Sequence, residues 1–182
     1  VEDNREIHMG RFGKRLKTKG GNFNSSGAFA QPGVQVVHID AVKYIATREK
    51  GDAFIIEYTY IWSNNPAIKQ GTSSSQFIQM SKDTADVNIW QFSEVAWTVK
   101  FHQTKQIKPD QVVSFADLSE EQIDAIIEMS VSAQNPLCGL VLGLDNYVIT
   151  TRQNKPFTVH EWMPFETLKA KIVSIATLSQ QM

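Results

Sequence analysis

The chain of 182 residues contains one cysteine, Cys138, and no long hydrophobic run. A lone cysteine cannot form an internal disulfide or complete a zinc knuckle, so we expect Cys138 to be a small buried side chain without a chemical role. The longest apolar stretch, near residues 138–144, is far shorter than the roughly 20 residues of a membrane span. No charged and then apolar leader resembles a signal peptide. These absences predict a soluble protein that does not contact a membrane.

Recognisable catalytic patterns are also missing. Three acidic residues of the strand-like segments, Asp40, Glu57 and Glu161, stand alone rather than in a cluster that could hold a metal ion. The four histidines lack metal-ligand spacing, and there is no Walker loop, dinucleotide-binding glycine pattern or nucleophile elbow. We therefore predict that the protein is not an enzyme and uses neither a metal nor a cofactor.

Acidic residues are absent between Ile7 and Ile39, although the whole chain has a net charge of only -1. This segment is rich in glycine, serine and asparagine, and it has no hydrophobic periodicity. Its positive charges are Arg11, Lys14, Arg15, Lys17 and Lys19. Residues 1–33 are thus predicted to be a flexible basic leader. It could wrap a nucleic-acid strand, contact an acidic neighbour in an assembly, or remain without order.

What the chain does contain is an internal repeat of a β-hairpin, over residues 34–62 and 137–163. At one fixed offset Tyr44 matches Tyr147 and Phe54 matches Phe157. Each copy has a strand bearing a tyrosine, a polar and basic turn, and a second strand that begins with the phenylalanine. In the first copy, a period of two places four aromatic residues on one face of the second strand. These residues are Phe54, Tyr58, Tyr60 and Trp62.

The remaining segments add one strand and several helices. We expect the strand over residues 75–80 and a helix that begins near Thr84. Ser119 and Gln122 have the spacing of a capping box, which predicts the start of a second helix. An apolar stripe over 165–178 predicts a closing amphipathic helix. The expected fold class is α+β: an OB-like small β-barrel or curled antiparallel sheet with two or three packed helices, forming one domain over residues 34–182.

Several short segments resemble a family of small tailed-phage proteins encoded among replication and recombination genes. The resemblance covers roughly residues 34–164 and is carried by Lys50 to Phe54, Ser63 to Pro66, Gly71 to Ser75, Ala85 to Ile89, Asn135 to Gly139 and Phe157 to Val159. Members of this family are regarded as single-stranded-DNA-binding proteins. The resemblance implies an OB-like fold, DNA binding rather than catalysis, and a place in the cytoplasm of a bacterial host.

Binding of a single strand without sequence preference needs aromatic faces for stacking and positive charges for phosphates. The aromatic candidates are Tyr44, Tyr58, Tyr60, Trp62 and Tyr147. The basic candidates on or beside the hairpin turns are Lys43, Arg48, Lys50, Arg152 and Lys155, joined by Lys14, Arg15, Lys17 and Lys19 of the leader. Each aromatic residue could instead belong to the core, and each basic residue could simply be solvated.

Two functions therefore remain open from the sequence. The first is a phage-type single-stranded-DNA-binding protein that acts in replication or recombination, alone, as a homo-oligomer, or with other phage replication or recombination proteins. The alternative is a structural or assembly protein of a phage particle. In that case the OB-like body would be a platform, and the leader would be an arm that contacts a neighbouring subunit.

Overall fold

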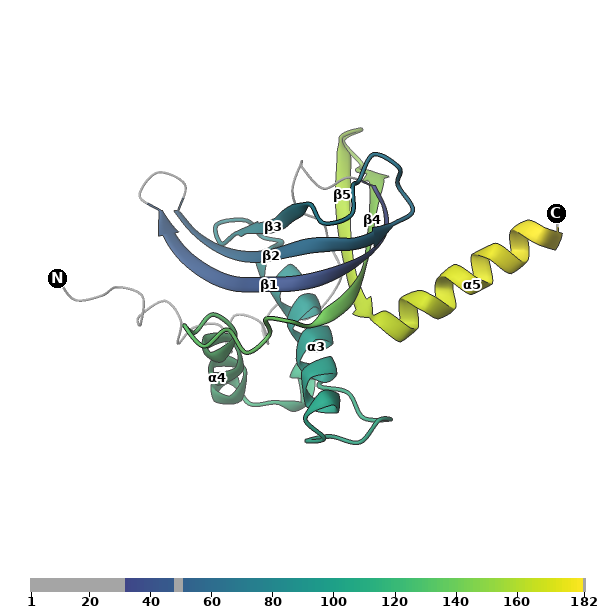
Figure 1. The fold of residues 1–182 in the computed structure, drawn as a ribbon. Helices are drawn as coiled ribbons and strands as arrows, with labels where there is room; N and C mark the ends of the chain where they lie inside the picture. The colour runs from purple at the N-terminus through teal and green to yellow at the C-terminus, as the bar shows by residue number, and fades with distance from the viewer. Residues whose placement is uncertain (1–31, 48–50, 182) are drawn as a thin grey trace.

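The computed structural model of this chain describes residues 32–47 and 51–181 (Figure 1). Nearly all of the predicted leader lies outside these described residues. Six candidate DNA-binding residues also lie outside them, namely Lys14, Arg15, Lys17, Lys19, Arg48 and Lys50.

Five antiparallel strands form one open sheet with the neighbour order β3-β2-β1-β4-β5. The strands are β1 (Gly33–Thr47), β2 (Gly51–Ser63), β3 (Ser73–Gln79), β4 (Val141–Thr150) and β5 (Pro156–Pro164). The β1–β2 and β4–β5 pairs are the two hairpins that the sequence repeat predicts, and β3 is the predicted third strand. All five strands are therefore confirmed, and the central strand β1 joins the two hairpins.

The helices also follow the predicted starts. The long helix α3 (Ala85–Gln103) has Thr84 at its N-cap, and the closing helix is α5 (Phe165–Gln181). A short 3-10 helix, η1 (Phe115–Asp117), precedes α4 (Glu120–Ser130). At the start of α4 the Gln122 amide donates to Ser119 Oγ at 3.1 Å, and the Ser119 amide donates to Gln122 Oε1 at 2.9 Å. This reciprocal pair is the predicted capping box.

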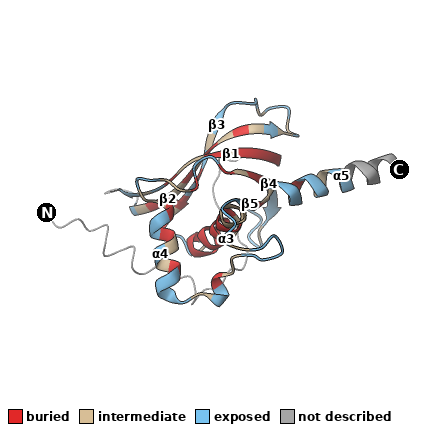
Figure 2. Cartoon of the chain, turned by 60° about the horizontal axis from the view of Figure 1, so that its bottom comes forward, coloured by how far each residue is buried: buried red, intermediate tan, exposed pale blue. Residues whose placement is uncertain are grey.

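The sheet curls around α3, and the main core lies between them (Figure 2). Trp162 of β5 is central to this core, with its ring centroid 5.7 Å from that of Tyr58 on β2 and 5.1 Å from that of Phe92 on α3. Its indole Nε1 donates to Oε1 of Gln76 on β3 at 2.8 Å. Because β3 and β5 are the two edges of the sheet, these contacts link the edges across the concave side.

Helix α5 packs on the opposite, outer side of the sheet and extends away from the body (Figure 1). Its Leu168 is fully buried against β4 and β5. A Cβ atom built on Gly143 of β4 would lie 2.7 Å from Leu168 Cβ and 2.9 Å from Met163 Cγ. Glycine at 143 therefore allows the helix to approach the strand closely. Beyond this crossing, Lys171 Nζ forms an ion pair with Asp145 Oδ2 at 2.6 Å.

The structure confirms the α+β class, with a curled antiparallel sheet and three α-helices among the described residues. Within the same part of the chain, no helix has the length and apolar character needed to cross a membrane.

Cys138 differs from the expectation of a buried side chain, because it is exposed. It lies in the turn before β4, where Leu137 and Leu140 are buried instead. The turn places these two leucines in the core, and the cysteine between them points outward.

Candidate nucleic-acid interface

The aromatic face of β2 is mostly core. Tyr58 has an exposed fraction of 0% and Tyr60 of 6%, because this face of the strand points toward α3 and Trp162. The ring of Tyr58 packs edge-on against those of Tyr60 and Trp162. Burial also raises the pKa of the Tyr58 hydroxyl far above its ordinary value. Of the two roles that the sequence leaves open for these tyrosines, DNA stacking or core, both belong to the core, and a base cannot reach either ring in this conformation.

Trp62, at the end of the same strand, has the opposite environment. Its side chain is 42% exposed and lines a groove on the outer side of the sheet together with Ile61 and Val36. The β1–β2 register shifts between Val36 and Val37, so the strict alternation of β2 does not continue to its last residues. Trp62 is therefore accessible although the two tyrosines before it are not.

Lys43 and Tyr44 of β1 both have partners on β2. Lys43 is exposed, and its Nζ lies 2.9 Å from Glu57 Oε1. Tyr44 packs at the edge of the core, and its hydroxyl donates to Asp52 Oδ2 at 2.5 Å. Lys43 thus remains at the surface with its charge partly balanced, while Tyr44 is held in place by its hydroxyl.

Phe77 of β3 is an exposed aromatic residue that was not among the sequence candidates. Its side chain is 42% exposed, and it is paired with Ile55 of β2, which in turn is paired with Lys43 of β1. The three residues form one row across the outer face of β1, β2 and β3. Strand alternation could have identified Phe77, because neighbouring Phe77 and Ile78 must point to opposite faces and Ile78 lies in the core.

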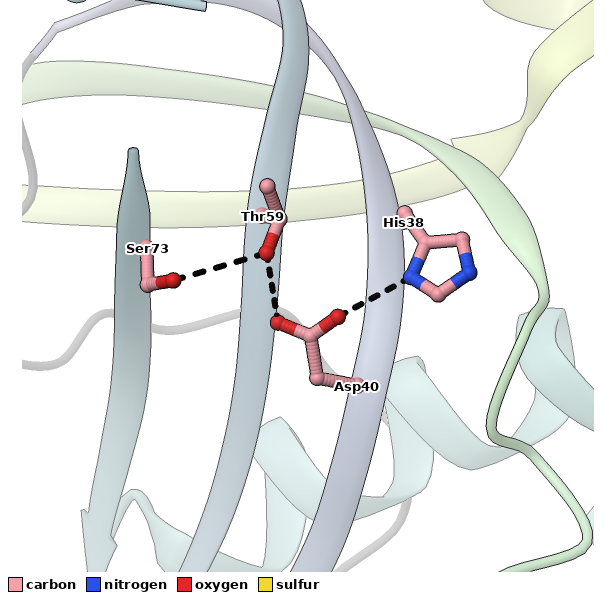
Figure 3. A network of polar contacts seen from close by, with 4 residues as sticks. All are labelled: His38, Asp40, Thr59 and Ser73. Carbon is pink, nitrogen blue, oxygen red and sulfur yellow. Dashed lines mark hydrogen bonds and ion pairs between the residues drawn. The ribbon is translucent and has the colours of Figure 1, made fainter. Parts of the chain in front are cut away.

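A polar network lies further along the same outer face (Figure 3). Asp40 is at a register shift between Ile39 and Ala41, where its carboxylate meets two side chains. Thr59 Oγ1 donates to Asp40 Oδ2 at 2.7 Å, and His38 Nδ1 lies 2.9 Å from Asp40 Oδ1. Ser73 Oγ is 3.5 Å from Thr59 Oγ1, which continues the network to β3. These groups can offer hydrogen bonds to a polar ligand, but Asp40 adds negative charge there.

The second hairpin presents its side chains to solvent near its turn. Tyr147, Val148 and Ile149 of β4 are all exposed, as are Arg152 and Lys155 in the turn. The turn is closed by a hydrogen bond from the Thr151 amide to the Lys155 carbonyl at 3.0 Å. Partial burial and the nearby carboxylates of Glu161 and Asp145 raise the pKa of Tyr147. This hairpin therefore combines apolar area with two accessible positive charges.

In the described part of the chain, the sequence candidates that reach solvent are Lys43, Trp62, Tyr147, Arg152 and Lys155. They lie on both hairpins and on the outer side of the sheet. Within those same ranges, no group of three or more His, Cys, Asp or Glu side chains could hold a metal ion. Neither a protein-family model nor a curated protein matches this chain.

Proposed function

We propose that this chain is a phage-type single-stranded-DNA-binding protein with an OB-like fold. The strand neighbours support the OB-like part: β1 is next to β2 and β4, β2 is next to β3, and β4 is next to β5. An OB barrel connects its five strands in this order and brings the third and fifth together. In this chain the helices α3 and α4 come between β3 and β4, and the Trp162–Gln76 hydrogen bond joins the sides of β3 and β5.

The outer face of β2 and β3 is the proposed DNA surface. OB-folds bind oligonucleotides on this face and with the loops between strands one and two and between strands four and five. Here those two loops are the basic hairpin turns, and the face carries Phe77 beside Ile55. The observation that carries the proposal is the exposed ring of Phe77, which offers a base a stacking surface beside Ile55 on this face.

The proposed mechanism is occlusion of the strand rather than chemistry. A base stacks on Phe77, and such stacking contributes about 1–3 kcal/mol per base. Because Lys43 is already paired with Glu57 and His38 with Asp40, phosphate contacts would depend on Arg152 and Lys155 and on the cations outside the described residues. Trp62 and Tyr147 are further stacking candidates. The protein would act in replication or recombination in the host cytoplasm, alongside other phage proteins.

A titration with labelled oligonucleotides at two salt concentrations tests this function. We expect a mixed-sequence single strand to bind more tightly than its duplex, with an affinity that falls as salt rises because counterions are released. Phe77→Ala should weaken binding by about 1–3 kcal/mol without changing the melting temperature. Phe165→Ala is the matched control, since Phe165 is also an exposed phenylalanine but lies on α5. Equal or absent binding of both DNA forms at low salt would overturn the proposal.

The exposed second hairpin favours one alternative, an assembly protein of a phage particle. Val148 and Ile149 are neighbours on β4 and point to opposite faces, yet both are exposed. Apolar side chains on both faces of a hairpin suit insertion between other subunits. Sedimentation of the same preparations distinguishes the two functions, because assembly predicts concentration-dependent oligomers with no response to DNA.

A further inference from the structure

An apolar groove of about 490 Å³ lies on the outer side of the sheet, beneath α5. Val36, Ile61 and Trp62 line it from the sheet, and Phe165, Ile172 and Val173 line it from the helix. Trp62, Phe165 and Val173 are all exposed large hydrophobic side chains. Such a concentration of accessible apolar area is typical of a surface that another segment covers.

Pro32, the first residue that the structure describes, is hydrogen-bonded close to this groove. Asn65, just after β2, donates from Nδ2 to the Pro32 carbonyl at 2.8 Å, and the neighbouring Asn64 accepts from the Val34 amide at 2.9 Å. Gly33 has a φ of 139°, and a Cβ built there would lie 2.7 Å from Asn64 Oδ1. Residues 32–34 are therefore fixed to Asn64 and Asn65, two and three positions after Trp62. The first 31 residues of the chain are connected to the body at this place.

The residues just before this anchor are uncharged. There is no Lys, Arg, Asp or Glu from Gly20 to Ile39, and Phe29 is the aromatic residue nearest to Pro32. Three residues of extended chain cover up to roughly 10 Å, so Phe29 can reach the neighbourhood of Trp62. The cations of the leader are further from Pro32 along the sequence, at positions 11–19.

We infer that the segment around Phe29 folds back into this groove, with the Phe29 ring between Trp62 and the α5 side chains that line the groove. The groove exceeds the volume of one phenylalanine side chain. Lys169 also lines it, but the accessible surface of its walls is almost entirely apolar, so a segment without charges can be buried there at little cost. Docking at Phe29 would anchor the leader and leave its basic part free. While Phe29 is docked, Trp62 is not available for base stacking, so Phe77 and Tyr147 are then the stacking candidates.

Trp62 is a built-in reporter for this contact. The other three tryptophans, Trp90, Trp97 and Trp162, are at most 8% exposed, so acrylamide quenching of tryptophan fluorescence mainly reports Trp62. Phe29→Ala in the full chain should increase the quenching constant by about twofold, because removal of the covering ring uncovers much of the indole. Phe23→Ala is the matched control and should leave quenching unchanged. Trp62→Phe should abolish the response.

Val173→Ser provides a second variant on the opposite wall of the groove, and it should raise Trp62 quenching as Phe29→Ala does. Unchanged quenching in both variants, with the thermal unfolding of each protein intact, would overturn the inference. So would wild-type quenching that falls as protein concentration rises while sedimentation detects dimers, because a second copy of the chain would then cover the groove.

Discussion

At the scale of single residues, burial separates aromatic side chains that the sequence makes look alike. Tyr58 and Tyr60 pack with Trp162 in the core, whereas Trp62 and Phe77 reach solvent. The accessible pair lies where stacking or docking is physically feasible, and the buried pair stabilises the sheet. Substitutions at Tyr58 or Tyr60 would therefore affect folding before they affect any ligand.

His160 on β5 is a buried residue whose protonation should control stability. Its side chain is 3% exposed, it pairs with Asn146 of β4, and burial lowers its pKa to about 4. An unfolded histidine has a pKa near 6.5, so between about pH 6.5 and 4 His160 is protonated in the unfolded chain but neutral in the folded protein. The free energy of unfolding should therefore fall as the pH falls across this window, by about 3 kcal/mol in total.

Urea unfolding of the wild type and of His160→Gln at pH 7.5 and 4.5 checks this prediction. The variant should show a smaller loss between the two pH values. Burial raises the pKa of Glu94, which acts in the opposite direction, but Glu94 is present in both proteins and cancels in the comparison. Identical pH dependence in the two proteins would contradict the role assigned to His160.

At the scale of elements, α5 is held to the sheet by a small set of side chains. Helix α3 lies inside the curl of the sheet, and α4 buries Ile123 and Ile127 in the main core. The described packing of α5 depends on Leu168, on the partly buried Ile172 and on the ion pair of Lys171 with Asp145. The seating of α5 on the sheet therefore depends on the close approach at Gly143.

Gly143→Ala should displace α5 without unfolding the sheet. The added methyl group meets Leu168 Cβ and Met163 Cγ at distances below 3 Å, so the helix must shift. Overpacking of this kind costs about 1–3 kcal/mol. Hydrogen exchange should become faster for α5 amides while α3 amides, an internal control, keep their protection. Unchanged exchange in α5 would mean that the helix accommodates the methyl group where it lies.

At the scale of the whole molecule, the described body and the basic leader carry different parts of the proposed function. The outer face of the body offers stacking side chains, but Lys43 is already paired with Glu57 and His38 already contacts Asp40. Five cations of the leader, by contrast, stand in a segment without acidic residues. Much of the salt-dependent affinity should therefore come from the leader.

Deletion of residues 9–31 should keep the fold and weaken single-strand binding. Pro32 and its hydrogen bond to Asn65 remain, and the described core keeps all of its strands and helices. Each phosphate that is no longer neutralised lowers the slope of log affinity against log salt by about 0.7, so five cations account for a change of up to about 3.5. Oligonucleotide titrations across a salt series measure this slope. A truncated protein with the full slope would place the phosphate contacts on the body instead.

The local elements of this protein could be predicted from its residues without the fold. The hairpin repeat, the capping box of Ser119 and Gln122 and the apolar stripe of α5 are local patterns, and the corresponding structures form where they predict. Turn residues, cap chemistry and periodicity act within a few positions along the chain, which is why they can be interpreted without knowledge of distant contacts.

Which faces of those elements lie inside depends on the packed molecule. Strand alternation defines two faces of β2, but only the packing of α3 and Trp162 makes the tyrosine face core. The same packing turns Phe77 outward, exposes Trp62 at a register shift, and leaves Cys138 outside between two buried leucines. These outcomes depend on contacts between residues far apart in the chain, and such contacts form only when the sheet curls and its helices pack.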